Sequence, residues 1–140
     1  MNISGNVNLI INGDVYGGNA PTINVLNGSS LKMYIVGNMT SNNGFHFNNL
    51  TNIPRNLKIY GASNGVQNFS FSSNSIIFGT IYAPNANVSF RDNCDFYGAV
   101  VAKSVSSHNS CNFYCDVAIP EPCTLALLGL SGMLLSRNKK

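Results

Sequence analysis

The distribution of apolar and polar residues before position 117 predicts short strands separated by polar turns. Runs rich in β-branched and aromatic residues alternate with clusters of Asn, Gly and Ser. The apolar runs are Leu9-Ile10-Ile11, Met33-Tyr34-Ile35-Val36, Leu57-Lys58-Ile59-Tyr60, Ile76-Ile77-Phe78 and Ala99-Val100-Val101-Ala102. No stretch before residue 123 shows sustained helical periodicity. The pattern therefore predicts an all-β body.

An aromatic residue or Val followed by Gly recurs along this body. The copies are Tyr16-Gly17, Val36-Gly37, Tyr60-Gly61, Phe78-Gly79 and Tyr97-Gly98, and Tyr114-Cys115 is a sixth copy without the glycine. The steps between copies are 20, 24, 18, 19 and 17 residues. A period near 18 is too short for helical repeats and is typical of one coil of a β-solenoid. A β-sandwich with regularly spaced turns is the alternative.

We therefore predict a right-handed single-stranded β-helix of about six coils over residues 1–116, with an insertion over residues 41–56. Asn at the corners should adopt left-handed turns and stack in ladders. We expect the tyrosines to alternate inward and fill the core. If they faced outward, they would offer a surface on which sugar rings could stack. These tyrosines are Tyr34, Tyr60, Tyr82, Tyr97 and Tyr114.

The composition narrows the class of protein. Charged residues make up only 9% of the chain, far below the usual quarter, while 23 residues are Asn. An apolar content of 44% excludes ordinary disorder. Three of the eight basic residues lie in the last four positions, so residues 1–119 hold five basic and four acidic side chains. The body is therefore nearly neutral, and nucleic acid is not predicted as a partner.

The C-terminal residues form a three-part tail. Pro120-Glu121-Pro122 precedes an apolar segment, and the chain ends with basic residues. The anchor residues are Thr124, Leu125, Ala126, Leu127, Leu128, Leu130, Met133, Leu134 and Leu135, and the basic stop is Arg137, Lys139 and Lys140. As a helix, the 13 residues from 124 to 136 would span roughly 20 Å, less than the ~30 Å hydrocarbon core, so the basic side chains would have to reach the interface. A buried C-terminal helix of a soluble domain is the alternative.

This tail resembles the PEP-CTERM sorting signal of bacterial surface proteins. The resemblance implies a short hydrophobic helix that holds the protein transiently in the inner membrane, with the basic end in the cytoplasm. It also implies an exosortase-type membrane peptidase that cuts near Pro-Glu-Pro and releases the body to the cell surface or extracellular matrix. Cys123 departs from the small hydroxyl residue usual there. The predicted organisation is a solenoid (1–116), a linker (117–122) and a helix with a basic tail (123–140).

A second resemblance concerns the body. Residues 79–88, 96–105 and 112–114 contain Tyr82-Ala83-Pro84-Asn85-Ala86, Phe96-Tyr97-Gly98-Ala99 and Asn112-Phe113-Tyr114. They look like the ending of choice-of-anchor A adhesin-like and pilus-associated domains of unknown function, over about residues 57–116. That resemblance implies a right-handed β-helix and supplies no catalytic residues to transfer.

Two cysteines occupy equivalent positions in neighbouring coils. Cys94 and Cys111 would stack about 5 Å apart, within reach of a disulfide. We favour two small buried side chains, because parallel stacking aims both Cβ atoms the same way. A zinc site from these two with Cys115 and His108 is the remaining alternative, and no C-x-x-C pair supports it.

Catalytic chemistry has little support. The carboxylates Asp92, Asp95 and Asp116 are few and scattered, and His46 and His108 are expected in exposed turns. We predict no enzyme, no metal and no cofactor. The segment Met1–Asn6 has neither a basic region nor a long apolar run, so we interpret the sequence as the C-terminal part of a longer exported protein.

The functional hypothesis is a non-catalytic cell-surface or extracellular-matrix protein sorted by an exosortase. The first alternative is an adhesin or carbohydrate-binding module that uses the coil face, with exopolysaccharide as partner. A polysaccharide-acting β-helix enzyme is the second.

Overall fold

The computed structural model describes residues 1–115, which fold into strands and one short 3₁₀ helix. The elements are β1 (Asn2–Ile3), β2 (Asn6–Ile11), β3 (Val15–Gly17), β4 (Thr22–Val25), β5 (Ser30–Ile35), β6 (Met39–Ser41), β7 (His46–Asn49), η1 (Pro54–Asn56), β8 (Leu57–Gly61), β9 (Gln67–Phe71), β10 (Ile76–Arg91), β11 (Asp95–His108) and β12 (Asn112–Cys115).

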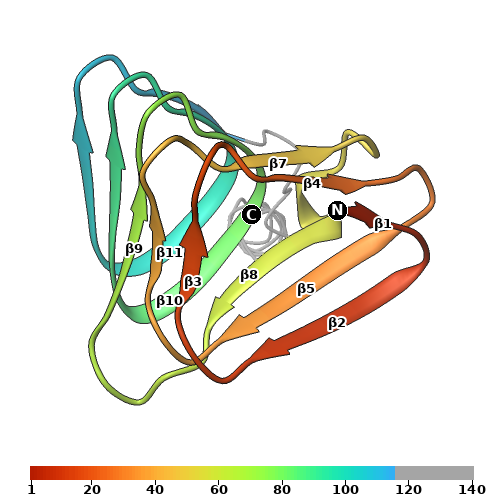
Figure 1. The fold of residues 1–140 in the computed structure, drawn as a ribbon, viewed down its shortest axis with the longest axis horizontal. Coiled ribbons are helices and arrows are strands. Elements are labelled where there is room, and N and C mark those ends of the chain that lie inside the picture. Colours follow the sequence, from red (N-terminus) through yellow and green to blue (C-terminus); the bar gives the residue numbers. More distant parts are fainter. Residues whose placement is uncertain (116–140) are drawn as a thin grey trace, which may run out of the picture.

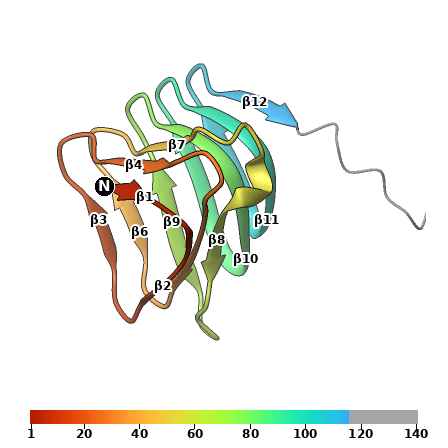
Figure 2. The same cartoon turned by 90° about the vertical axis from the view of Figure 1, so that its right-hand side faces the viewer.

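Every strand pairs in parallel with the equivalent strand of the next coil, which builds three outer faces (Figures 1 and 2). The first face contains β1, β4, β7, the starts of β10 and β11, and β12. The second contains β2, β5, β8 and the middle of β10 and β11. The third contains β3, β6, β9 and the ends of β10 and β11. This is a parallel β-solenoid of about five turns, and a sandwich of antiparallel sheets is excluded.

The predicted solenoid architecture is confirmed, with about five turns where we predicted about six coils. The predicted phase of the repeat is partly wrong. Only Phe78-Gly79, Tyr97-Gly98 and Tyr114-Cys115 stack on one another. Tyr16 instead pairs with Thr40, and Tyr60 pairs with Tyr34 and Tyr82. Apolar-Gly pairs therefore lie at different places around the coil, and their spacing alone did not fix which of them align.

The coils also differ in length along the chain. Partner residues are 24 apart from Asn6 to Ser30, 30 apart from His46 to Ile76 and 17 apart from Asp95 to Asn112. The predicted insertion over 41–56 is too wide, because it includes β7. Phe47 in this strand is 1% exposed and Phe45 just before it is 3% exposed, so both belong to the core. The extra residues of this coil lie between β7 and β8, where η1 forms, and between β8 and β9.

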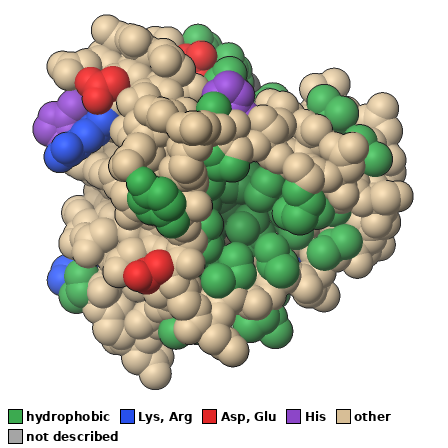
Figure 3. All heavy atoms as spheres, in the orientation of Figure 1, with side chains coloured by type: hydrophobic (Ala, Val, Ile, Leu, Met, Phe, Trp, Pro, Cys, Tyr) green, Lys and Arg blue, Asp and Glu red, His purple; other side chains and the backbone are tan. Residues whose placement is uncertain are grey.

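The core consists of rows of apolar side chains that run along the solenoid axis. One row is formed by Leu9, Met33, Ile59, Ile81 and Val100 from five successive coils. A second is aromatic, with ring centroids of Phe71 and Phe90 5.4 Å apart. Burying each such side chain stabilises the fold by about 1.5–3 kcal/mol. At the N-terminal end the apolar interior reaches the surface, where hydrophobic side chains gather in the centre of Figure 3.

The corner between the third and first faces has a repeating local structure. In the last three coils two consecutive residues have positive φ: Ser73-Asn74, Asp92-Asn93 and Asn109-Ser110. Asn, Asp and Ser tolerate this conformation because short polar side chains can hydrogen-bond locally. The expected Asn ladders are also present: Asn24 Nδ2 donates to Asn2 Oδ1 (2.8 Å) and Asn48 Nδ2 to Asn24 Oδ1 (3.0 Å). Both expectations for Asn are therefore confirmed.

Gly98 provides a test of the coil-to-coil contact. Its φ is +143°, and a Cβ at this position would overlap the carbonyl oxygen of Gly79 in the preceding coil. We expect Gly98→Ala to lower the free energy of unfolding by about 3 kcal/mol or more, because backbone strain and steric overlap act together. Gly13→Ala is the matched control, since nothing lies within 4 Å of its Cβ position, and it should change stability by less than about 1 kcal/mol. Urea denaturation of the full chain measures both, and equal midpoints would contradict the packing described.

Candidate functional site

The predicted sorting tail lies outside the described residues. This applies to the sorting signal Pro120, Glu121 and Pro122, to the anchor residues from Thr124 to Leu135, to the basic stop and to the predicted helix. Within residues 1–115 no helix has the length and apolarity needed to cross a bilayer. The tail and its anchoring role therefore remain predictions.

The structure brings Cys94 and Cys111 together at the corner between the third and first faces. Asn112 N donates to Cys94 O (2.8 Å), so the two cysteines occupy adjacent coils. The Cys94 thiol is 1% exposed and donates to Arg91 O (2.8 Å), and Cys111 Sγ donates to His108 O (3.0 Å). Ser75 occupies the same position one coil earlier, and its hydroxyl donates to Ser72 O (2.8 Å). This corner position therefore holds a small side chain that donates a hydrogen bond to a backbone carbonyl oxygen of the turn.

Both cysteines are free thiols in the structure, so the disulfide remains a prediction. Burial raises the pKa of the Cys94 thiol, and the neighbouring Cys111 raises it further, while the backbone hydrogen bond at Arg91 opposes the shift. A raised pKa means a smaller thiolate fraction near neutral pH, so Cys94 is a weak nucleophile.

The acidic residues of the last coils are hydrogen-bonded within polar ladders. Asn109 Nδ2 donates to Asp92 Oδ1 (2.9 Å), and Asn112 Nδ2 donates to Asp95 Oδ1 (2.9 Å). His46 lies on the first face, whereas His108 pairs with Arg91 at the end of the third. No group of three or more His, Cys, Asp or Glu within residues 1–115 could hold a metal. The carboxylates and imidazoles named here are therefore spread over different ladders and faces of the solenoid.

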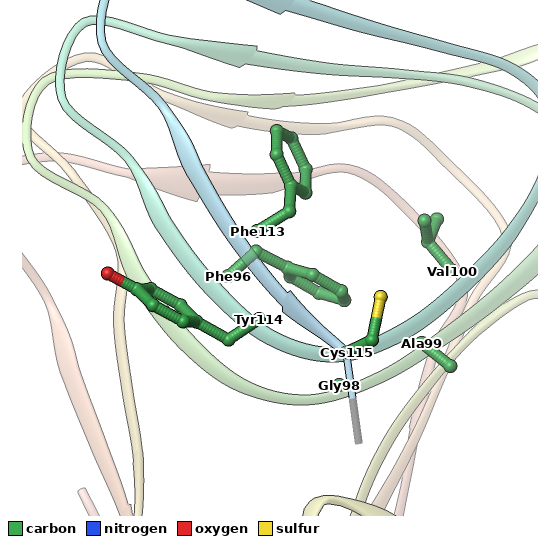
Figure 4. A pocket seen from close by; sticks show the side chains of 7 residues that line it. All are labelled: Phe96, Gly98, Ala99, Val100, Phe113, Tyr114 and Cys115. Atoms are coloured by element: carbon green, nitrogen blue, oxygen red, sulfur yellow. The ribbon is translucent and has the colours of Figure 1, made fainter. Parts of the chain in front are cut away.

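An apolar recess of about 310 Å³ opens at the C-terminal end of the described coils. Phe96, Phe113, Val100 and Cys115 surround it in Figure 4, while the Tyr114 ring points away. Its lining offers no carboxylate, imidazole or amine. The recess can therefore accept an apolar group, and the ionisable side chains in its lining are those of Tyr114 and Cys115.

The expectation that the tyrosines fill the core is wrong. Tyr82 is 52% and Tyr114 47% exposed, and the other predicted tyrosines are half-buried on outward positions. The reason is the two-residue alternation of a strand. In Met33-Tyr34-Ile35 and in Ile81-Tyr82-Ala83 the flanking apolar residues take the inward positions, which places each tyrosine outside.

The outward tyrosines form two rows. On the first face Phe78, Tyr97 and Tyr114 stack, with centroids of Tyr97 and Tyr114 4.4 Å apart. Partial desolvation and the neighbouring Tyr114 raise the pKa of Tyr97, so its phenol stays neutral at physiological pH. On the second face Tyr34, Tyr60 and Tyr82 form what we call the tyrosine row.

The rings of the tyrosine row are not all alike. Tyr34 and Tyr60 are stacked, with centroids 4.8 Å apart and planes at 8°, so they cover each other's facing sides. Tyr82 is inclined at 62° to Tyr60, with centroids 6.3 Å apart. The ring of Tyr82 is therefore turned out of the stack and is the most exposed of the three.

A lysine row runs beside the tyrosine row on the second face. Lys32 and Lys58 pair directly across β5 and β8, and Thr80 continues the row in β10. Between the rows lies a shallow hollow of about 270 Å³. It is lined by Arg55, Lys58, Ile59, Tyr60, Thr80, Ile81, Tyr82, Ala99 and Val101. This hollow thus combines cationic, hydroxyl and aromatic groups on one face of the solenoid.

Comparison with known proteins places this architecture in a family. The family model described as Domain of unknown function (DUF7305) matches residues 2–121, which is most of the chain. The chain belongs to the DUF7305 family. No curated protein and no solved structure matches. The DUF7305 match does not bear on the resemblance to PEP-CTERM tails or to choice-of-anchor A domains.

The sequence analysis of this DUF7305 chain did not identify the basic side chains of the second face as part of a candidate site. Lys32, Arg55 and Lys58 were counted only toward net charge. The available signal was the parallel between Leu31-Lys32-Met33-Tyr34 and Leu57-Lys58-Ile59-Tyr60, which places Lys and Tyr on one side of two strands. Arg55 had no such signal, because η1 is not a strand.

The different environments of the thiols in this DUF7305 chain predict different reactivities. Cys115 is exposed, whereas Cys94 is buried and its pKa is raised. At pH 8 iodoacetamide should modify Cys115 at least about tenfold faster than Cys94, because the thiolate is the reactive form and the buried thiol requires opening of the fold. Time-resolved peptide mass spectrometry of the full chain measures the rates. In 6 M guanidinium the two should converge, and equal rates in the folded chain would contradict the corner structure.

Proposed function

We propose that this protein is a non-catalytic bacterial cell-surface or extracellular-matrix protein, delivered by an exosortase-type membrane peptidase through its C-terminal tail. The observation that carries the proposal is the combination of two parts. One is a parallel solenoid in which the His, Cys, Asp and Glu side chains of residues 1–115 form no group of three or more, and in which Asp92 and Asp95 are hydrogen-bonded to Asn side chains. The other is the tail of Pro-Glu-Pro, apolar segment and basic end.

The tail would act in a defined order. The apolar segment from Thr124 to Leu135 enters the inner membrane, and Arg137, Lys139 and Lys140 remain on the cytoplasmic side. The solenoid then lies on the outer side. Cleavage near Pro120-Glu121-Pro122 releases it from the membrane to the cell surface or matrix.

The right-handed sense of the coil belongs to the same proposal. Two features support it. Parallel strand crossovers are right-handed in nearly all proteins because of the strand twist. In Figure 1 the chain runs clockwise from β2 through β3 to β4 as successive coils recede from the viewer.

The mature C-terminus tests the delivery route. In a bacterial host that has an exosortase, mass spectrometry of the surface fraction should find the chain ending near Pro122. Replacing Pro120-Glu121-Pro122 by three alanines should retain the full tail in the inner-membrane fraction. A chain that keeps Lys140 in a soluble fraction would refute the proposal.

A second candidate function is carbohydrate binding by the coil face, with exopolysaccharide as partner. The outward tyrosine row favours it, because exposed aromatic rings beside polar groups are typical of ligand-binding surfaces. The chain has six Tyr and no Trp, so tyrosine absorbance reports on this surface. Adding host exopolysaccharide should change the near-ultraviolet difference spectrum of the full chain, and Tyr82→Ala should reduce the change by at least about half. An unchanged spectrum at saturating polysaccharide argues against this candidate.

A further inference from the structure

We propose that the second face binds an acidic polysaccharide, with the hollow beside Tyr82 taking one carboxylated sugar ring. The inference rests on the carbohydrate-binding candidate function. It adds the class of ligand, its position and the residues that recognise it.

Charge complementarity is the first argument. Lys32 and Lys58 stand directly opposite each other on neighbouring parallel strands, which lie about 4.8 Å apart. Like charges in that position destabilise a sheet. The three carboxylates of residues 1–115 are Asp14, Asp92 and Asp95, and none lies on the strand segments of the second face. Among residues 1–115, therefore, no carboxylate lies on these strand segments beside the two lysines, and an anionic ligand would reduce their repulsion.

The third cation is held by the inserted segment of the third coil. Asn49 is buried, and its Nδ2 donates to Ile53 O (2.7 Å). Thr51 Oγ1 donates to Asn49 Oδ1 (2.6 Å), and Asn56 Nδ2 donates to Thr51 Oγ1 (3.1 Å). These bonds order the turn on both sides of Arg55, which lines the same hollow as Lys58. A planar guanidinium can bind a carboxylate through two parallel hydrogen bonds.

The rest of the lining favours a sugar over other anions. Ala99 and Val101 give the hollow an apolar border, Thr80 adds a hydroxyl, and the exposed ring of Tyr82 stands beside them. A sugar ring has an apolar face and polar edges, so it can use all of these groups at once. A bare polyphosphate could use the cations and hydroxyl groups but not the apolar border or the ring face of Tyr82. A uronic acid carries its carboxylate on the ring and would satisfy both parts of the surface.

The surface continues beyond one sugar. Lys32 and the stacked pair of Tyr34 and Tyr60 extend the two rows toward the N-terminal coils. We infer that the polysaccharide runs along the solenoid axis across β5, β8 and β10. Lys32 of β5 and Lys58 of β8 would then contact successive carboxylates, and Thr80 of β10 would offer its hydroxyl to the next sugar.

Binding by the full chain to three probes tests the inference. The probes are polygalacturonate, its fully methyl-esterified form and polyphosphate, measured by affinity electrophoresis and biolayer interferometry. Polygalacturonate should bind at least about tenfold more tightly than the ester, and the binding should weaken with salt because the charges are exposed. Polyphosphate should bind more weakly than polygalacturonate.

Variants with matched controls localise the site. Lys58→Gln and Arg55→Gln should each weaken polygalacturonate binding by about threefold to tenfold, and Tyr82→Ala by about tenfold or more. Lys103→Gln and Tyr114→Ala change an exposed cation and an exposed tyrosine outside the hollow, so they should stay within about twofold. All five variants should unfold close to the urea concentration at which the parent chain unfolds, since they alter outward side chains.

The possible failures are distinguishable. Equal affinity for polygalacturonate and its ester would overturn the acidic class of ligand and leave carbohydrate binding standing. Equal affinity for polyphosphate, insensitive to Tyr82→Ala, would show a general polyanion surface and overturn the inference. Binding of neither polysaccharide would overturn both the inference and the carbohydrate-binding candidate, without touching the sorting proposal. Equal losses in the control variants would overturn the assignment to the hollow.

Discussion

In-register pairing between successive coils is the constraint on which the rest of this structure depends. Each coil satisfies its backbone hydrogen bonds through the coils above and below, as Asn112 N does with Cys94 O. Pairing in parallel places equivalent residues in columns along the axis. The residues of one column are direct neighbours, so the column is stable only if their side chains pack or hydrogen-bond favourably with one another. Inside, this requirement gives apolar rows such as that of Met33, Ile59 and Ile81. At the corners it gives small donors, namely Ser75, Cys94 and Cys111.

The same rule explains why surface columns carry functional information. Asn24 and Asn48 form a favourable column because an amide both donates and accepts. Asp92 and Asp95 are placed beside Asn residues, which satisfies a carboxylate without a cation. Lys32 beside Lys58 is the exception, because two ammonium groups can only repel. This pair lowers the stability of the sheet and lies next to exposed aromatic rings, which is consistent with the proposed role in binding an anionic ligand.

The proposed division of labour follows from these features. The body offers a repetitive surface rather than a deep polar pocket, which suits a long polymer better than a small substrate. In the proposed function the tail would supply a route to the outside of the cell, where such polymers occur. The solenoid body and the tail would depend on different residues of the sequence. Delivery requires the Pro-Glu-Pro segment and an apolar run, while recognition requires outward residues at the coil spacing.

The sequence by itself determined the class of fold. Short β-branched runs, Asn-rich turns and a spacing near one coil predicted a parallel β-solenoid, and Asn74 and Asn93 adopt the expected left-handed corners. Only the tertiary structure decided which residues meet. Partners are 26 residues apart for Lys32 and Lys58 but 22 apart for Lys58 and Thr80, because coils differ in length. Alternation then placed the tyrosines outside, and the inserted turn brought Arg55 to the same hollow. Local patterns reveal the period of a strand, but contacts between coils depend on the length of every intervening loop.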